Sequence, residues 1–233
     1  MVERPAYDLT VFKLHFGKIT AKMYTKGERV LPIEIIVHNT KELPCGRSLP
    51  KFSEIVLHLK AILNRFLNAL RCMDLASISA DGLDDWHKPS QVAQTRVGGV
   101  NVNQPRMRAV LEAVIGLAAA PHGFRCADLA DKVQSSAIRD YTPRQAAYDL
   151  KKLRGKHLVR KIDNSRRYEP VPEGLQTMAA LLILREKVLK PILAGAGKPR
   201  CGRKPKPQSQ VDIHYANIQT EMRTLFQTIG LAL

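Results

Sequence analysis

The sequence predicts an α+β fold with a small three-stranded antiparallel sheet capped by one long helix, then a group of three helices and a hairpin, then extended C-terminal helices. Two patterns support this prediction. Apolar and polar residues alternate between residues 9 and 39, which is typical of half-buried strands. From residue 52 onwards, apolar residues recur every three or four positions, as they do on amphipathic helices. The predicted organisation is a sheet and helix domain at 1–80, a linker at 81–104, a helical domain at 105–194, a basic linker at 195–210 and a helix at 211–233.

Three strands are expected in the N-terminal segment. Gly17 permits a tight reversal after the first strand, and residues 26–29 turn the chain into the third. Pro32 has no amide hydrogen for a ladder, so the third strand should lie at an edge or carry a bulge. The following helix should cover the sheet with one apolar stripe, formed by Phe52, Ile55, Val56, Leu59, Ile62, Leu63, Phe66, Leu67 and Leu70.

Residues 81–104 show no periodicity and contain Pro89, Gly98 and Gly99, so they are interpreted as a linker. Trp86 and His87 are expected to anchor this linker on a domain. A helix over 105–120 follows, Pro121 interrupts it, and a second short helix is expected over 124–133.

A third helix over 142–154 has the clearest start signal in the chain. Thr142 can cap it, Pro143 suits its first turn, and Gln145 occupies the position of a capping-box partner. Gly155 is expected to end it in a left-handed turn. One side of this helix, with Ala146, Leu150 and Leu153, should pack against the helix at 106–119. The other side carries Arg144, Tyr148 and Lys151, with Gln145 and Lys152 at its margins.

Two short runs at 158–162 and 166–171 flank Asp163-Asn164-Ser165 and predict a hairpin. The run at 147–159 resembles the recognition helix and first wing strand of bacterial winged helix-turn-helix regulators. This resemblance implies double-stranded DNA as the partner, with the helix at 142–154 in the major groove. The expected DNA-binding residues are Arg144, Gln145, Tyr148, Lys151, Lys152, Lys156, Arg160, Arg166 and Arg167.

Composition agrees with a polyanionic partner. The formal net charge is +16 and the sequence pI is about 9.9, with most of the excess after residue 100. The four cysteines are far apart and form no zinc or disulfide pattern, so they are expected to be reduced thiols. With no signal peptide or membrane span expected, the predicted location is cytoplasmic and nucleoid-associated. Neither a metal nor a cofactor is predicted.

The basic stretch at 198–207 contains prolines and glycines but no acidic residue. Its residues Arg200, Arg203 and Lys204 are similar to a degenerate AT-hook, a motif that inserts arginines into a narrow minor groove. A flexible charged linker is the alternative interpretation.

The outer face of the predicted sheet is a second candidate site. The stretch at 22–34 is similar to a pattern in rolling-circle replication initiators of plasmids and phages. That similarity implies Tyr24 as a nucleophile on a phosphodiester, and Glu34 with His15 or His38 as metal ligands. The alternative is a sheet face that is merely polar or docks on a partner.

The last helix has an apolar stripe that suits a helix partner; its members are Val211, Tyr215, Ile218, Met222, Leu225 and Ile229. Homodimerisation, a partner protein bound through this helix or through the N-terminal sheet, and packing within the chain all stay open. The sequence as a whole predicts a DNA-binding protein with a regulatory or site-recognition role in a bacterial mobile element. Two alternatives remain: a tyrosine-dependent nickase or accessory subunit of a replication or transposition complex, and a protein-interaction module.

Overall fold

The computed structural model describes residues 1–6, 9–27, 30–43, 49–76, 80–136, 138–190 and 209–228. These residues form a mixed α/β structure that divides into two compact units, Met1–Ala179 and Ala180–Leu233. The predicted basic stretch at 198–207, with Arg200, Arg203 and Lys204, lies outside the described residues.

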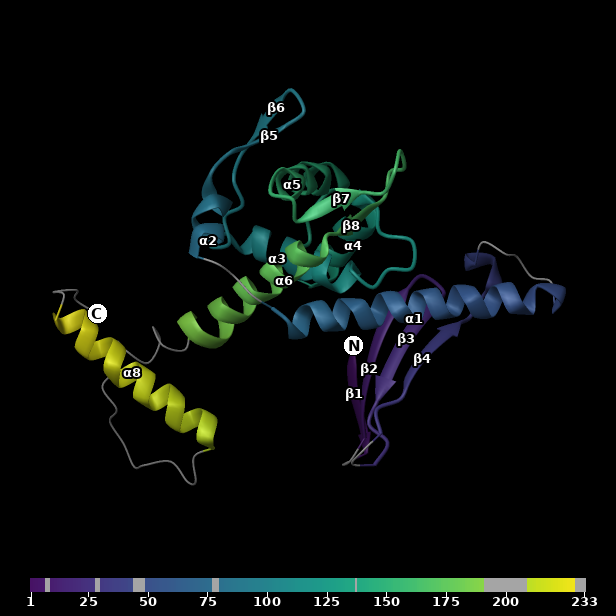
Figure 1. Cartoon of the computed structure of the whole chain (residues 1–233), viewed down its shortest axis with the longest axis horizontal. Helices are drawn as coiled ribbons and strands as arrows, with labels where there is room; N and C mark the ends of the chain where they lie inside the picture. Colours follow the sequence, from purple (N-terminus) through teal and green to yellow (C-terminus); the bar gives the residue numbers. More distant parts are fainter. Residues whose placement is uncertain are drawn as a thin grey trace. The chain divides into compact units, whose positions relative to one another are not determined.

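The N-terminal sheet has four antiparallel strands in the order β1-β2-β3-β4, one more than predicted (Figure 1). The strands are β1 (Val2–Ala6), β2 (Leu9–Phe16), β3 (Ile19–Tyr24) and β4 (Ile33–Val37). The prediction missed β1 because its sequence does not alternate and includes Pro5. A proline is tolerated there because β1 is an edge strand that pairs with β2 alone, with a register shift between Glu3 and Ala6. At the other edge lies β4, as Pro32 predicted.

The long helix α1 (Phe52–Asp74) packs on one face of this sheet, as expected. Ile19 of β3, Leu43 and Ile62 of α1 form the centre of the core. The apolar side chains packed around them are Phe16, Ile35, Val37 and Ile55. Two short 3-10 helices, η1 (Thr40–Glu42) and η2 (Leu49–Lys51), precede α1. The first residue of the predicted stripe, Phe52, is exposed instead of buried.

The predicted linker at 81–104 is wrong for most of its length. It contains the helix α2 (Ala80–His87) and a hairpin of β5 (Ser90–Val92) and β6 (Thr95–Val97). The sequence did not reveal this hairpin, because three-residue strands are too short to show a period. The turn between them also contains no glycine as a signal, since Ala93 takes the left-handed conformation there, with φ of 52°. Burial of Trp86, Val97 and Val100 fixes the segment, which confirms Trp86 as an anchor, whereas His87 is exposed.

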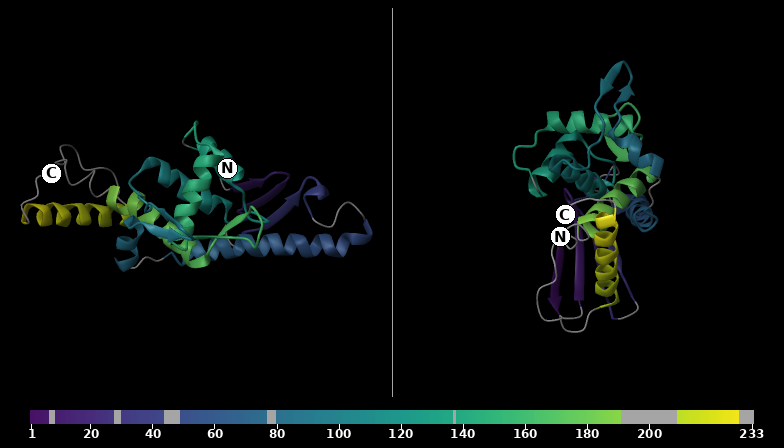
Figure 2. Two further views of the ribbon diagram at one scale, coloured as in Figure 1. Left: turned by 90° about the horizontal axis from the view of Figure 1, so that it is seen from above. Right: turned by 90° about the vertical axis from the view of Figure 1, so that its left-hand side faces the viewer.

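Three helices and a second hairpin follow, close to the predicted positions. They are α3 (Pro105–Leu117), α4 (Cys126–Ser136), α5 (Pro143–Gly155), β7 (Val159–Lys161) and β8 (Tyr168–Pro170), followed by α6 (Pro172–Ile183). Leu150 and Leu153 of α5 are buried, as are Val110 and Val114 of α3, which confirms the predicted phase of both helices. Both hairpins contact α5 and lie on either side of it (Figures 1 and 2).

The prediction that Gly155 ends α5 in a left-handed turn is wrong. Gly155 is still helical, and the positive φ of 56° belongs to His157. Gly155 serves a different purpose, because a Cβ atom there would lie 2.7 Å from Ser90 Cβ and 3.0 Å from Val92 Cγ2. Its missing side chain therefore lets β5 approach the end of α5.

The second unit contains the end of α6, a π-helical turn (Leu184–Leu189) and α8 (Gln210–Thr228). The Tyr215 hydroxyl donates a hydrogen bond to the Lys187 carbonyl. Along the predicted apolar stripe of α8, Val211, Ile218 and Leu225 are exposed, while Ile229 is outside the described residues. The predicted partner for this stripe stays a prediction.

Replacing Leu150 by alanine should lower the free energy of unfolding by about 2–5 kcal/mol, because the side chain is completely buried and α3, α4 and α5 cannot collapse fully into the space. Denaturant unfolding measures the change. Leu57→Ala is the matched control, since Leu57 is 64% exposed and its loss should change stability by less than about 0.5 kcal/mol. Equal stability of the two variants would contradict the assigned packing of α5.

Candidate nucleic-acid interface

The start of α5 is fixed by a complete capping box. The backbone amide of Gln145 donates to Thr142 Oγ1 at 3.3 Å, and the backbone amide of Thr142 donates to Gln145 Oε1 at 2.8 Å. These two bonds satisfy amides that have no partner within the helix. The side chain of Gln145, predicted to bind DNA, is therefore engaged in the cap.

A buried carboxylate holds α5 from its inner side. Asp149 is only 1% exposed, and its Oδ2 accepts hydrogen bonds from Tyr141 Oη at 2.9 Å and from Arg106 Nε and Nη2 at 3.0 and 2.8 Å. Its Oδ1 accepts no hydrogen bond from the described residues, and Lys152 Nζ lies 3.9 Å from it. Because a buried charge is costly without partners, these contacts tie α5 to α3.

Tyr141 takes part in this cluster as a permanent donor. Burial raises the pKa of its phenol far above the ordinary value of 10.0, and the negative charge of Asp149 raises it further. The Arg106 guanidinium lies 5.4 Å from the centre of the Tyr141 ring. The hydroxyl therefore keeps its proton throughout the physiological pH range.

The outer side of α5 carries the predicted exposed residues. Arg144 is exposed, Tyr148 is 49% exposed and Lys151 is half-buried. Lys152 differs, since its side chain is only 16% exposed and its Nζ lies 4.9 Å from the centre of the Tyr148 ring. The ammonium group of Lys152 therefore lies between the Tyr148 ring and the Asp149 carboxylate, and little of its side chain is exposed.

Three of the predicted cations around α5 are engaged within the chain. Arg160 Nε and Nη2 lie 2.8 and 2.7 Å from Glu169 Oε1, while Arg65 of α1 pairs with the other oxygen of the same carboxylate. Lys156 donates to the Asp85 carbonyl. Arg167 Nη1 donates to the Gly123 carbonyl at 3.3 Å.

Other cations near α5 keep their charge available. Among the described residues, no carboxylate pairs with Arg144, Lys151 or Arg166. The same holds for two cations that the sequence interpretation did not select, Lys161 at the end of β7 and Arg96 on β6, both of which are exposed. Lys161 could have been selected from the sequence, because it lies within the predicted hairpin. Arg96 could not, because it lies in the segment that was predicted to be a linker.

The candidate residues of the sheet face form two separate groups. Tyr24 Oη donates to Glu34 Oε1 at 2.7 Å, beside Lys22, whose Nζ lies 3.6 Å from Glu34 Oε2. His15 Nδ1 and His38 Nε2 instead lie 3.0 and 3.3 Å from Thr20 Oγ1. Within the described ranges, no three histidine, cysteine or acidic side chains are grouped so as to hold a metal.

The hydrogen bond to Glu34 raises the pKa of the Tyr24 phenol above its ordinary value. A tyrosine nucleophile needs the opposite change, because the phenolate is the reactive form. The nickase interpretation therefore requires a rearrangement of this pair and stays a prediction.

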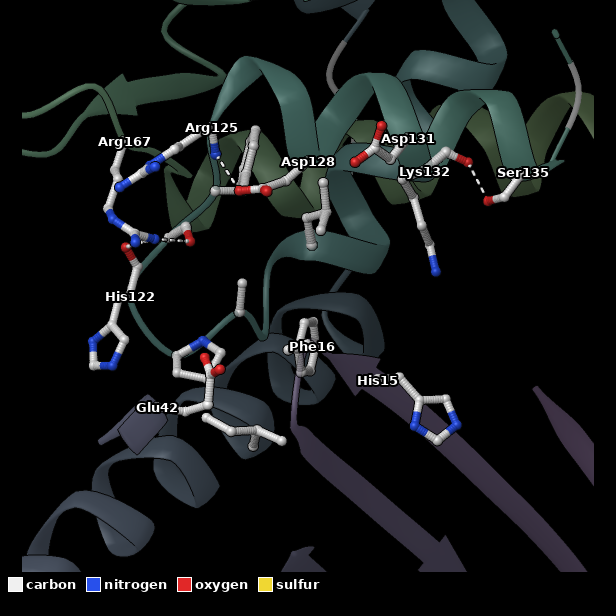
Figure 3. Close-up of a pocket in the computed structure, with 17 residues that line it drawn as sticks. His15, Phe16, Glu42, His122, Arg125, Asp128, Asp131, Lys132, Ser135 and Arg167 are labelled. Carbon is white, nitrogen blue, oxygen red and sulfur yellow. Dashed lines mark hydrogen bonds between the residues drawn. The ribbon is translucent and has the colours of Figure 1, made fainter. Parts of the chain in front are cut away.

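A pocket of about 510 Å³ lies where β2, α3 and α4 come together (Figure 3). Its lining mixes charges: Arg125, Lys132 and Arg167 are interspersed with Glu42, Asp128 and Asp131. Burial and the nearby Arg167 lower the pKa of His122, so this imidazole adds no positive charge near neutral pH. Because positive and negative charges are mixed in its lining, this pocket does not favour a polyanionic ligand. The outer side of α5, in contrast, carries mainly positive charge.

Comparison with known proteins adds no further information. No family model, no curated protein sequence and no solved structure matches this chain. Of the helices in the described ranges, none has both the length and the apolar character that a membrane span requires.

Replacing Tyr141 by phenylalanine should destabilise the protein at pH 7 by about 1.5–3 kcal/mol, because Asp149 loses a donor. This difference should shrink above pH 10. There the unfolded chain releases the phenolic proton near the ordinary pKa of 10.0 while the folded chain retains it, so the wild type loses about 1.4 kcal/mol per pH unit from this group. Urea unfolding of both proteins between pH 7 and 11 measures the difference, and a constant difference would contradict the buried phenol.

Proposed function

We propose that this chain binds double-stranded DNA as a winged helix-turn-helix protein, with α5 as the recognition helix and the β7–β8 hairpin as the wing. The observation that carries the proposal is the outer side of α5, where Arg144, Tyr148 and Lys151 are accessible on a helix fixed at its start and along its inner side. A helix of this kind fits the major groove of B-form DNA.

The order of the elements supports the proposal. Three helices are followed directly by a two-stranded hairpin, and α4 and α5 pack closely together. This order is that of a helix-turn-helix with an appended wing. Fold alone does not determine function, so the proposal also depends on the charges on the surface around α5.

The charge distribution favours nucleic acid over a neutral partner. Residues 143–168 contain nine lysines and arginines but only two acidic residues, and one of these, Asp149, is buried. The net charge of the whole chain has the same sign, at +16. Such clustering attracts phosphates by releasing condensed counterions, which makes binding strongly dependent on salt.

The contacts within the chain divide the cations into two roles. Arg144 and Lys151 have side chains free to reach base edges or phosphates beside α5, and Lys161 and Arg166 are free at the wing. Lys156, Arg160 and Arg167 fix the hairpins by their bonds to Asp85, Glu169 and Gly123, so their contribution to DNA binding is to hold the surface in shape. A regulatory or site-recognition role in a bacterial mobile element remains part of this proposal.

Substituting Tyr148 or Lys151 by alanine should reduce discrimination between a preferred and an unrelated duplex, at a cost of about 1–3 kcal/mol for each lost base contact. The preferred duplex is first selected with the wild-type chain from random DNA, and fluorescence anisotropy then measures affinity for both duplexes. Substituting Lys161 or Arg166 should weaken binding to both duplexes alike and reduce the salt slope by about 0.9 per lost phosphate contact.

The matched control is Arg71→Ala, since Arg71 is an exposed cation on α1. This variant should bind both duplexes like the wild type. The proposal is wrong if the Tyr148 and Lys151 variants retain full discrimination, or if the wild type shows no affinity for duplex DNA at low salt.

A further inference from the structure

The β5–β6 hairpin packs against α5 on the side opposite to β7–β8, and both hairpins project from the same face of the structure as α5 (Figures 1 and 2). The close contact lies between β5 and Gly155, where only a residue without a side chain fits beside Ser90 and Val92. The hairpin is thus part of the surface that surrounds α5.

The base of this hairpin is rigidly anchored. Trp86, Val97 and Val100 are buried, and the Val100 amide donates to the Trp86 carbonyl at 2.7 Å. The Lys156 ammonium group, which follows α5, donates to the Asp85 carbonyl at the end of α2. These contacts hold the hairpin in a fixed relation to α5, so its exposed end does not need to be ordered by a ligand.

The exposed part of the hairpin is polar and basic. Arg96 is paired across the strands with Gln91, and both side chains are exposed on the face that lies away from Ser90 and Val92. The Gln91 side chain donates to the Ala93 carbonyl at 3.1 Å, which stabilises the tight turn at Ala93 and Gln94. No acidic residue occurs between residues 86 and 111 of the sequence, so nothing local in that segment offsets the charge of Arg96.

A polar hairpin with an accessible arginine, fixed beside a recognition helix, has the features of a DNA-binding wing. We propose that β5–β6 is a second wing, which contacts the phosphate backbone of the duplex on the side of α5 opposite to β7–β8. Arg96 is the phosphate contact, and Gln94 lies exposed at the tip of the hairpin. This inference rests on the proposed binding of α5 to duplex DNA and extends the DNA surface beyond α5 and its first wing.

The test uses the full chain and the duplex selected with it. Affinity is measured for Arg96→Ala and for the control Arg71→Ala, over a range of salt concentrations and on duplexes shortened from either end. Arg96→Ala should bind about 3- to 10-fold more weakly at low salt, with a salt slope reduced by about 0.9, as expected for one lost phosphate contact. Trimming the duplex on one side should weaken the wild type but have little further effect on Arg96→Ala.

The outcomes separate this inference from the function on which it rests. If the wild type binds duplex DNA and Arg96→Ala has the same affinity and salt slope, β5–β6 is not a wing, while α5 retains its role. A photo-reactive group placed at residue 94 should cross-link to DNA under the same conditions. Cross-linking only to protein would identify β5–β6 as a contact between chains and overturn the inference, and absence of any duplex binding by the wild type would overturn both proposals.

Discussion

The buried carboxylate of Asp149 is the interaction on which the arrangement around α5 depends. All three hydrogen bonds to its Oδ2 come from outside α5, two from Arg106 on α3 and one from Tyr141 in the turn before α5. Asp149 is 1% exposed while the Arg106 side chain is 38% exposed, so loss of Arg106 would leave a buried carboxylate with fewer hydrogen-bond donors, which is unfavourable. Asp149 therefore determines the rotation of α5 about its axis, and with it which side chains point outwards.

The outer surface follows from this inner contact. With Asp149, Leu150 and Leu153 turned inwards, Arg144, Tyr148 and Lys151 must lie on the opposite side of a helix with 3.6 residues per turn. Lys152 lies between the two sides, close both to Asp149 and to the Tyr148 ring. At the end of α5, Gly155 leaves room for β5, and Lys156 bonds the Asp85 carbonyl of α2, so both residues hold the β5–β6 segment beside α5.

Features encoded by neighbouring residues could be predicted from the sequence. The start of α5 was predicted because Thr142, Pro143 and Gln145 are sufficient to define a capped helix, and the alternation along β2 to β4 correctly separated the packed side of that sheet from its polar side.

Features that depend on distant residues were not predicted. Strand β1 exists only through its pairing with β2, and β5–β6 is too short to show a period. The role of Asp149 required knowledge of Arg106, which lies 43 positions earlier in the chain. Several candidate cations were likewise selected without their partners: the engagement of Arg160 depends on Glu169 across the hairpin, and that of Lys156 depends on the distant Asp85.

The most direct test of the central claim is an NMR titration of the chain with its selected duplex, following backbone amides and arginine side chains. We expect the largest shift changes on Arg144, Tyr148 and Lys151, while the signals of the buried cluster formed by Tyr141 and Asp149 stay nearly unchanged. Changes concentrated on the polar side of the N-terminal sheet, with α5 unaffected, would contradict it.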